Sequence, residues 1–184
     1  CYDPFLSPTA EWVTYVCDAG NLFSGDVSLG YEKVYRTNFN NDTTDVASVA
    51  LCSNSTFGNA VSREPRITED GSRVFFETLS TNLINAVPSV TDTNGFYDIY
   101  VRNFDTQVTS LVSQVQSFGS SGNQASVDMA ISADGSVIAF RTPSDNMVPN
   151  DTNVAIDVFR STLVSIELPE CFCNTTLVDL TGCN

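Results

Sequence analysis

Hydrophobic and polar residues along this chain alternate with the two-residue period of β-strands, and no window sustains a helical period. The clearest run is RVFFET at Arg73–Thr78, which places Val74 and Phe76 on one face and Phe75 on the other. An Asp-Gly pair precedes it, and such a pair suits a tight hairpin because glycine accepts positive φ. Loops rich in Asn, Asp, Pro and Ser separate these runs, so the pattern predicts short antiparallel strands.

The pattern repeats along the chain. Residues 67–84 (ITEDGSRVFFETLSTNLI) return as residues 131–148 (ISADGSVIAFRTPSDNMV), with eight of eighteen positions identical. Residues 6–22 form a third and more divergent copy, in which Leu6 aligns with Ile67. A repeat of this kind indicates one small unit stacked several times.

Each copy supplies four predicted strands. In the second copy they cover residues 65–68, 73–78, 98–103 and 108–113, and residues 45–53 are the first copy's counterpart of the last. Four short antiparallel strands in about sixty residues have the size of a propeller blade. We therefore expect an all-β, β-propeller-like single domain of three four-stranded antiparallel blades in tandem, with a disulfide-tied tail: blades at about 4–53, 64–113 and 128–166, tail 167–184. A β-sandwich of about twelve strands is the alternative.

Three segments of the third copy carry a family resemblance: ISADGSVIAF (131–140), NMVPNDTN (146–153) and DVFR (157–160). They resemble the repeat of the TolB-like β-propeller family. The resemblance extends over nearly all of residues 4–166, although the first copy has Thr9-Ala10 in place of the Asp-Gly turn. Members of that family include periplasmic interaction proteins and non-catalytic domains of peptidases, so the resemblance implies a scaffold fold and not an activity.

The number of blades bears on function. Closed propellers need four to eight blades, and this chain supplies three, which would leave two apolar end faces in water. The chain is then a fragment of a longer propeller, half of a six-bladed ring, or the subunit of a head-to-tail fibre. Because Cys1 and Cys183 bracket the blades as if both ends were finished, we expect self-assembly into a ring or an extracellular filament. The alternative is a propeller fragment of a larger secreted protein that binds a glycan or another extracellular protein.

Charge and composition exclude several function classes. The net charge is −14, with a single lysine, Lys33, and no histidine. Such a surface repels nucleic acids and anionic membranes, and no segment is long and apolar enough to span a bilayer. The lack of histidine removes Ser-His-Asp and Cys-His nucleophile systems, and Lys33 is expected to be a solvated edge residue. We therefore expect no enzyme.

Six cysteines without a CxxC pair indicate disulfides and an oxidising compartment, so we expect an extracellular or secreted protein. If residues 4–7 and 12–17 form a hairpin, counting outward from the turn places Tyr2 opposite Cys17 and Cys1 beside it. A Cys1–Cys17 bridge is therefore favoured, and a lipid attached to Cys1 is the alternative. The remaining cysteines would tie the tail to itself and to the first blade: Cys52, Cys171, Cys173 and Cys183.

Four sequons for N-glycosylation fall in predicted loops or strand ends, at Asn41, Asn54, Asn150 and Asn174. The Asn, Ser and Thr content predicts about as many by chance, so the number proves nothing. In a eukaryotic host we expect glycans at Asn54 and Asn174.

One loop of the second copy concentrates oxygen donors. Asp92, Asn94 and Asp98 resemble part of a calcium loop, and calcium is the one cofactor that the sequence suggests. Asx turns are the alternative, in which the same side chains cap backbone amides. Paired carboxylates such as Asp92 with Asp98 could also serve glycoside hydrolysis. Because the set recurs in the third copy, as Asp151, Asn153 and Asp157, we expect a structural role.

Overall fold

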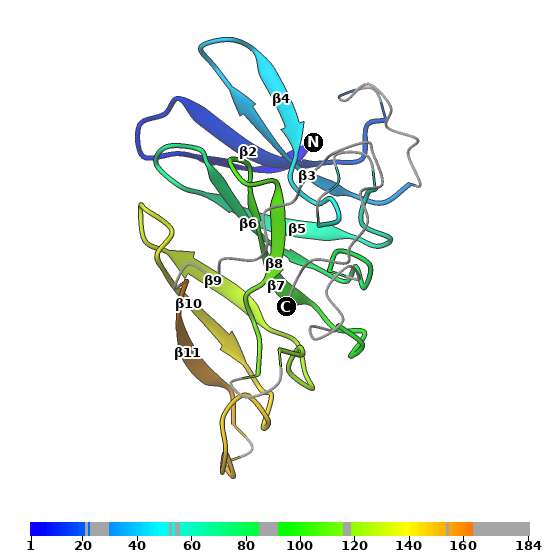
Figure 1. Ribbon diagram of the computed structural model, residues 1–184, viewed down its shortest axis with the longest axis vertical. Coiled ribbons are helices and arrows are strands. Elements are labelled where there is room, and N and C mark those ends of the chain that lie inside the picture. The colour runs from blue at the N-terminus through cyan, green and yellow to red at the C-terminus, as the bar shows by residue number, and fades with distance from the viewer. Residues whose placement is uncertain are drawn as a thin grey trace, which may run out of the picture.

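The computed structural model describes residues 1–20, 22, 30–51, 53, 56–84, 92–115, 119–153 and 155–163. Within these ranges the chain is all-β, and its strands form three antiparallel sheets of four, four and three strands. The sheets follow one another along the chain and stack in that order, from the first at the top of Figure 1 to the third at the bottom. This is the tandem, propeller-like arrangement that the repeat predicts.

Each sheet is a meander in which neighbours in sequence pair with one another. The first sheet contains β1 (Tyr2–Leu6), β2 (Trp12–Cys17), β3 (Lys33–Asn38) and β4 (Thr43–Val46). The second contains β5 (Ser62–Ile67), β6 (Arg73–Thr78), β7 (Asp98–Asn103) and β8 (Val108–Leu111). The third contains β9 (Val127–Ile131), β10 (Val137–Thr142) and β11 (Asp157–Thr162). Residues 164–184, which include the predicted tail and the end of the predicted third blade, lie outside the described residues.

Strands β2, β6 and β7 begin and end where the sequence predicts, and β1, β5 and β8 differ from the prediction by one to three residues at an end. Strand β4 differs more. The predicted strand covered residues 45–53, whereas β4 ends at Val46. The chain then turns, because the Val49 N–H donates to the carbonyl of Ala47 at 2.8 Å. Val49 instead forms an isolated bridge with Phe57, at the entry to the second sheet. Residues that look like strand continuation therefore connect two sheets.

The turn between the first two strands has the same geometry in all three sheets. Gly71 has a φ of 75° and donates its N–H to the carbonyl of Thr68 at 3.1 Å, and Gly135 repeats this arrangement. Ala10 has a φ of 56° and donates to the carbonyl of Ser7 at 2.8 Å. The first copy thus keeps the turn although it lacks the Asp-Gly pair, and an alanine occupies the left-handed conformation.

Strands β1, β5 and β9 share a bulge that the sequence did not reveal. An acidic residue has positive φ in each strand, at 51° for Asp3, 48° for Glu64 and 57° for Asp128. The pairing register shifts across each of these residues. A bulge bends its strand and increases the local twist. The first strand of every sheet therefore has the same distortion.

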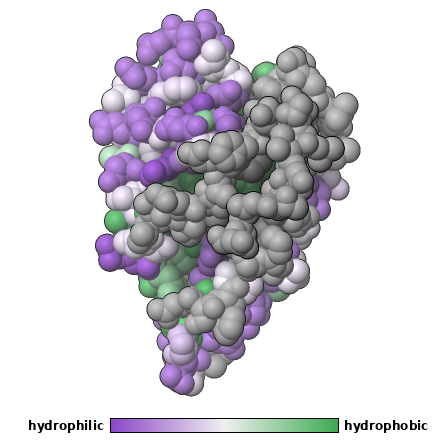
Figure 2. Space-filling view, in the orientation of Figure 1, coloured by the Kyte–Doolittle hydropathy of each residue, from purple (hydrophilic) through white to green (hydrophobic). Residues whose placement is uncertain are grey.

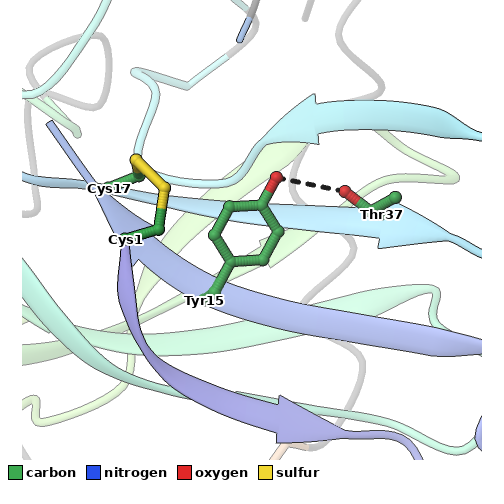
Figure 3. Close-up of a disulfide and its surroundings, with 4 residues drawn as sticks. All are labelled: Cys1, Tyr15, Cys17 and Thr37. Atoms are coloured by element: carbon green, nitrogen blue, oxygen red, sulfur yellow. Dashed lines mark hydrogen bonds between the residues drawn. A yellow bond between two sulfur atoms is a disulfide. The ribbon is translucent and has the colours of Figure 1, made fainter. Parts of the chain in front are cut away.

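The bulge in β1 sets the position of the disulfide. Tyr2 pairs with Val16 and not with Cys17, so Cys1 lies directly opposite Cys17. The two cysteines are bonded, and the bridge closes the hairpin beside Tyr15 (Figure 3). The predicted bridge is confirmed, although the predicted register was wrong by one residue. A lipid on the Cys1 sulfur is incompatible with this bond, so that alternative is wrong.

The apolar core lies between the sheets. Val74 and Phe76 of β6 belong to the cluster shared with the first sheet, which also contains Val16 and Val34. Phe75 belongs to the cluster shared with the third sheet. The two faces of β6 are therefore both buried, as the sequence predicts for the middle of a stack.

Candidate functional site: the sheet contacts and the two end faces

Arg36 on β3 links the first sheet to the second. Its Nε and Nη2 atoms donate to Asp45 at 2.9 and 2.8 Å, and Nη1 donates to the carbonyl oxygen of Gly71 at 2.6 Å. The guanidinium carbon lies 3.4 Å from the centre of the Phe104 ring and 4.4 Å from that of Trp12. Burial lowers the pKa of Arg36, and the bond to Asp45 opposes this. A planar cation held by stacking and hydrogen bonds fixes the position of one sheet relative to the other.

The turns of successive sheets are also hydrogen-bonded to one another. The Glu69 N–H of the second sheet donates to the carbonyl of Ala133 in the third at 2.8 Å. The equivalent residue of the first sheet is Pro8, which has no N–H. The hydroxyl of Thr9 makes the link instead and donates to the Glu69 carbonyl at 3.1 Å. In these contacts, as for Arg36, the donor belongs to the earlier sheet and the carbonyl to the later one.

Glu77 provides a second link between the second and third sheets. Its side chain is buried, and one carboxylate oxygen accepts from Arg63 Nε at 3.0 Å. The other oxygen accepts from the backbone N–H of Asp128 at 2.7 Å. Burial raises the pKa of Glu77, and these hydrogen bonds act in the opposite direction. The Arg63 guanidinium in turn lies 3.7 Å from the centre of the Tyr97 ring. Glu77 therefore holds two sheets together.

The predicted cation loop lies at the start of β7. Asp92 and Asp98 are both buried. Asp98 accepts hydrogen bonds from the Ser113 hydroxyl and the Asn94 amide, both at 2.7 Å, and Asp92 accepts one from the Tyr100 hydroxyl at 2.7 Å. Burial raises the pKa of Asp98 to about 7, and the nearby Asp92 charge adds to the rise. Both carboxyls are engaged by protein donors, which is an arrangement suited to holding a loop.

The loop is an Asx turn in both copies. The Asn94 side-chain oxygen accepts from the N–H two residues later at 2.6 Å, and Asn153 repeats this at 2.9 Å. Asn153 also donates to Asp157, as Asn94 donates to Asp98, but these third-copy residues are less buried. In the described part of the chain, no three His, Cys, Asp or Glu side chains are grouped to hold a metal. Calcium stays a prediction.

Lys33 is not the solvated edge residue that the sequence predicts. It begins β3, an inner strand that β2 and β4 cover on both edges. The residue is 3% exposed, and its ammonium lies 5.3 Å from the centre of the Phe57 ring. The lysine is therefore part of the packing around the first sheet.

The other predicted sites fall partly outside the described residues. Asn41 and Asn150 are exposed, in the β3–β4 turn and in the loop before β11. Six further predicted residues lie outside the described ranges: Asn54, Asn174, Cys52, Cys171, Cys173 and Cys183. Their glycosylation and pairing stay predictions. The described strands and loops include no helix with the length and hydropathy of a membrane span.

The outer face of the third sheet presents residues that the other sheets bury. Val158, the second residue of β11, is 78% exposed. Val34 and Ile99 take the same place in β3 and β7 and are fully buried. Arg160 takes the place of Arg36 and is also exposed. Hydrophobic residues show at the surface in the lower half of Figure 2, over the third sheet, whereas the described surface over the first sheet is mainly hydrophilic.

The outer face of the first sheet differs between its two ends. Near the disulfide, Tyr35 and Val46 are buried, with Ala19 and Leu22 packed against their cluster. Near the turns, Phe39 is 53% exposed. The expectation of two bare apolar end faces therefore describes the third sheet better than the first.

Phe39 has equivalents that the sequence could have shown. The pairs Asn38-Phe39 and Asn103-Phe104 follow β3 and β7 at the same point, and this short repeat was missed. Each phenylalanine N–H donates to a carbonyl just before the second strand of its own sheet, at 2.9 Å in both cases. Phe104 contacts Arg36 of the preceding sheet, whereas Phe39 has no preceding sheet among the described residues.

Comparisons with known proteins add little to what the structure itself shows. No protein-family model matches the sequence, and a search of curated proteins finds no match. A search of solved structures finds the crystal structure of TolB from Acinetobacter baumannii, with 15% sequence identity and a TM-score of 0.47. The match covers 89% of this chain but only 30% of that protein. The fold assignment therefore stands on the sheets themselves.

Proposed function

We propose that this chain is a secreted, non-enzymatic structural protein whose sheets associate with other copies of the same chain, as a ring or an extracellular filament. The observation that carries this proposal is the exposure of Val158, in a position that is fully buried in the two other sheets. Burying a side chain of this size is worth about 1.5 kcal/mol or more. The third sheet thus has the composition of a packing face without a sheet packed on it.

The chemistry of the chain agrees with a structural role outside the reducing cytosol. The Cys1–Cys17 disulfide is compatible with an oxidising compartment. The buried carboxyls of Asp92, Asp98 and Glu77 are engaged in hydrogen bonds that hold loops and sheets. None of these groups is presented to solvent in the way that a general acid or base would need.

The proposal is tested by the native mass of the protein over a range of concentrations, measured by light scattering or sedimentation. We expect the mass to exceed that of one 19.9 kDa chain and to rise with concentration. Val158→Glu should lower the mass without changing the circular dichroism spectrum, because the residue is already in water. Phe96→Glu is a suitable control, since Phe96 is also exposed but lies just before β7 in the middle sheet. A wild-type protein that is monomeric at every concentration would contradict self-assembly.

A second candidate function is a binding module of a larger secreted protein, with a glycan or an extracellular protein as its ligand. Exposed aromatic residues favour it: Tyr31 and Phe96 take equivalent places two residues before β3 and β7, and Tyr2 is also exposed. Aromatic side chains of this kind are enriched at binding surfaces. A monomeric wild-type protein that binds a glycan, with binding lost in Tyr31→Ala and Phe96→Ala, would favour this function over assembly.

A further inference from the structure

We infer that the outer face of the third sheet docks onto the first sheet of a second copy, head to tail, with Arg160 of one copy placed between sheets as Arg36 is within the chain. This inference rests on the proposed self-assembly and specifies which surfaces meet. The occupant is a second copy because the chain itself contains both halves of the contact, each on a different end.

The donor half lies on β11. Arg160 is the fourth residue of this strand, as Arg36 is the fourth residue of β3, and both face the sheet that would come next. Arg36 reaches the carbonyl of Gly71 and the ring of Phe104. Arg160 and Val158 are exposed, so the third sheet ends with this half of the contact uncovered.

The acceptor half lies at the turn end of the first sheet. Gly71 and Phe104, which receive Arg36, have their equivalents in Ala10 and Phe39. Ala10 has the left-handed turn geometry of Gly71, so its carbonyl is presented in the same way. Phe39 is 53% exposed, whereas Phe104 is partly buried against the cluster between the first two sheets. The first sheet thus presents a turn carbonyl and an aromatic ring, and none of the described sheets places an arginine against them.

A backbone hydrogen bond between turns also runs from each sheet to the following one. The N–H of Glu69 donates to Ala133 of the following sheet. Ala133 is exposed in the third sheet, at the position that Glu69 occupies in the second. In the head-to-tail arrangement its N–H meets the carbonyl of Pro8 in the next copy. Pro8 lacks an N–H but keeps its carbonyl, so it can accept this bond although it cannot donate one.

The turn contacts between sheets all run in one direction, and this distinguishes the head-to-tail arrangement from a two-fold dimer. Every turn contact described above runs from a donor in one sheet to a carbonyl in the next. A contact between unlike surfaces is heterologous, so it generates a closed ring or an open fibre and not a two-fold dimer. Because Val137 replaces Trp12 in the third sheet, Arg160 would be stacked on one ring and not on two. The contact between copies is then weaker than the one within the chain.

The test uses two variants that each remove one half of the contact, Arg160→Glu and Phe39→Glu. Both residues are exposed, so both variants should keep the thermal unfolding midpoint of the wild type. We expect each variant alone to be monomeric by sedimentation and an equimolar mixture to form a dimer. In the mixture, the intact Arg160 of one variant meets the intact Phe39 of the other. Phe96→Glu, which changes an exposed residue just before β7 of the middle sheet, should assemble like the wild type.

The outcomes separate the two proposals. A wild-type protein that stays monomeric overturns self-assembly and the head-to-tail contact together. A wild type that assembles, with variants that assemble equally well, overturns only the head-to-tail contact. If Arg160→Glu is monomeric while Phe39→Glu assembles, the third sheets pair with each other around a two-fold axis, which also overturns it. Restoration by mixing is the result that supports it.

Discussion

Arg36 and Phe104 join the first two sheets, with the guanidinium carbon of one 3.4 Å from the ring centre of the other. We expect Phe104→Ala and Arg36→Ala to be coupled by about 1–2 kcal/mol in a double-mutant cycle. Urea unfolding of the two single variants and the double variant measures this energy. Arg66 and Phe5, at 5.0 Å and more exposed, provide the matched pair, with an expected coupling below about 0.5 kcal/mol. Equal coupling in both pairs would contradict the role of Arg36.

The left-handed turn position predicts opposite effects for two substitutions. A Cβ atom added at Gly71 would clash with the Trp12 ring, so Gly71→Ala should lower the free energy of unfolding by about 3 kcal/mol. Ala10→Gly should not lower it and should raise it by up to about 1 kcal/mol, because Ala10 already has a φ of 56°. Chemical denaturation of both variants checks the prediction. A destabilised Ala10→Gly variant would show that the alanine side chain matters more than its backbone.

The disulfide predicts a stability loss confined to the first sheet. Cys1 and Cys17 close a loop with a sequence separation of 16 residues, so replacing both with serine should cost about 3 kcal/mol. Strand β1 should then become sensitive to limited proteolysis, because its side chains are exposed. The double variant should keep the β-sheet signal in circular dichroism. Unchanged denaturation of Cys1→Ser/Cys17→Ser would show that the bridge contributes little.

The buried pair Asp92 and Asp98 predicts a pH dependence. The pKa of Asp98 is raised to about 7, above the value of about 3.9 in an unfolded chain. A raised carboxyl pKa means that the folded state binds the proton more tightly, so its contribution is complete below pH 4. Stability should fall as the pH rises from about 4 to 7, by up to roughly 4 kcal/mol, and then level off. The midpoint of urea unfolding, followed from pH 4 to 8, measures the slope.

Two variants isolate that titration. Asp98→Asn should remove most of the slope, because its neutral amide cannot lose a proton. Asp134→Asn should keep the slope, because the pKa of exposed Asp134 is lowered to about 2 by its bonds to Ser132 and Ser136. The contribution of Asp134 is complete above its unfolded pKa and is lost as the pH falls from about 4 to about 2, below the measured range. A slope that persists in Asp98→Asn would assign the titration to another group.

Calcium can be tested at the same loop. The oxygens of Asp98 accept hydrogen bonds from Ser113 and Asn94, so we expect the chelator EGTA to leave the thermal unfolding midpoint unchanged. A midpoint that falls with EGTA and recovers with calcium would show that the protein binds calcium. Asp98→Asn should then abolish the response if Asp98 is a ligand.

The repeat made the strands predictable. Arg73–Thr78 has the same bounds in the sequence pattern and in the structure, because strand alternation and an Asp-Gly turn are local properties. The Cys1–Cys17 bridge was also predictable, since a one-residue register error still leaves Cys1 beside its partner. The bulge at Asp3 was not, because an acidic residue carries no clear signal for a left-handed backbone.

The candidate site was less predictable than the fold. Exposure of Val158 and burial of Val34 cannot be distinguished by alternation, since both residues occupy the same place in a repeated strand. The prediction that Lys33 is solvated was wrong for a related reason. Its burial depends on Phe57, which approaches from a distant part of the chain.

The sequence by itself determined that this protein is a stack of three similar β-sheets, because hydrophobic period and turn residues act over a few positions. Only the tertiary structure decided which copy of each repeated residue is covered. Arg36 lies between two sheets and Arg160 lies in water, although their surrounding sequences, VYR and VFR, are nearly the same. The physical reason is that burial depends on the neighbouring sheet, and the third described sheet has no successor.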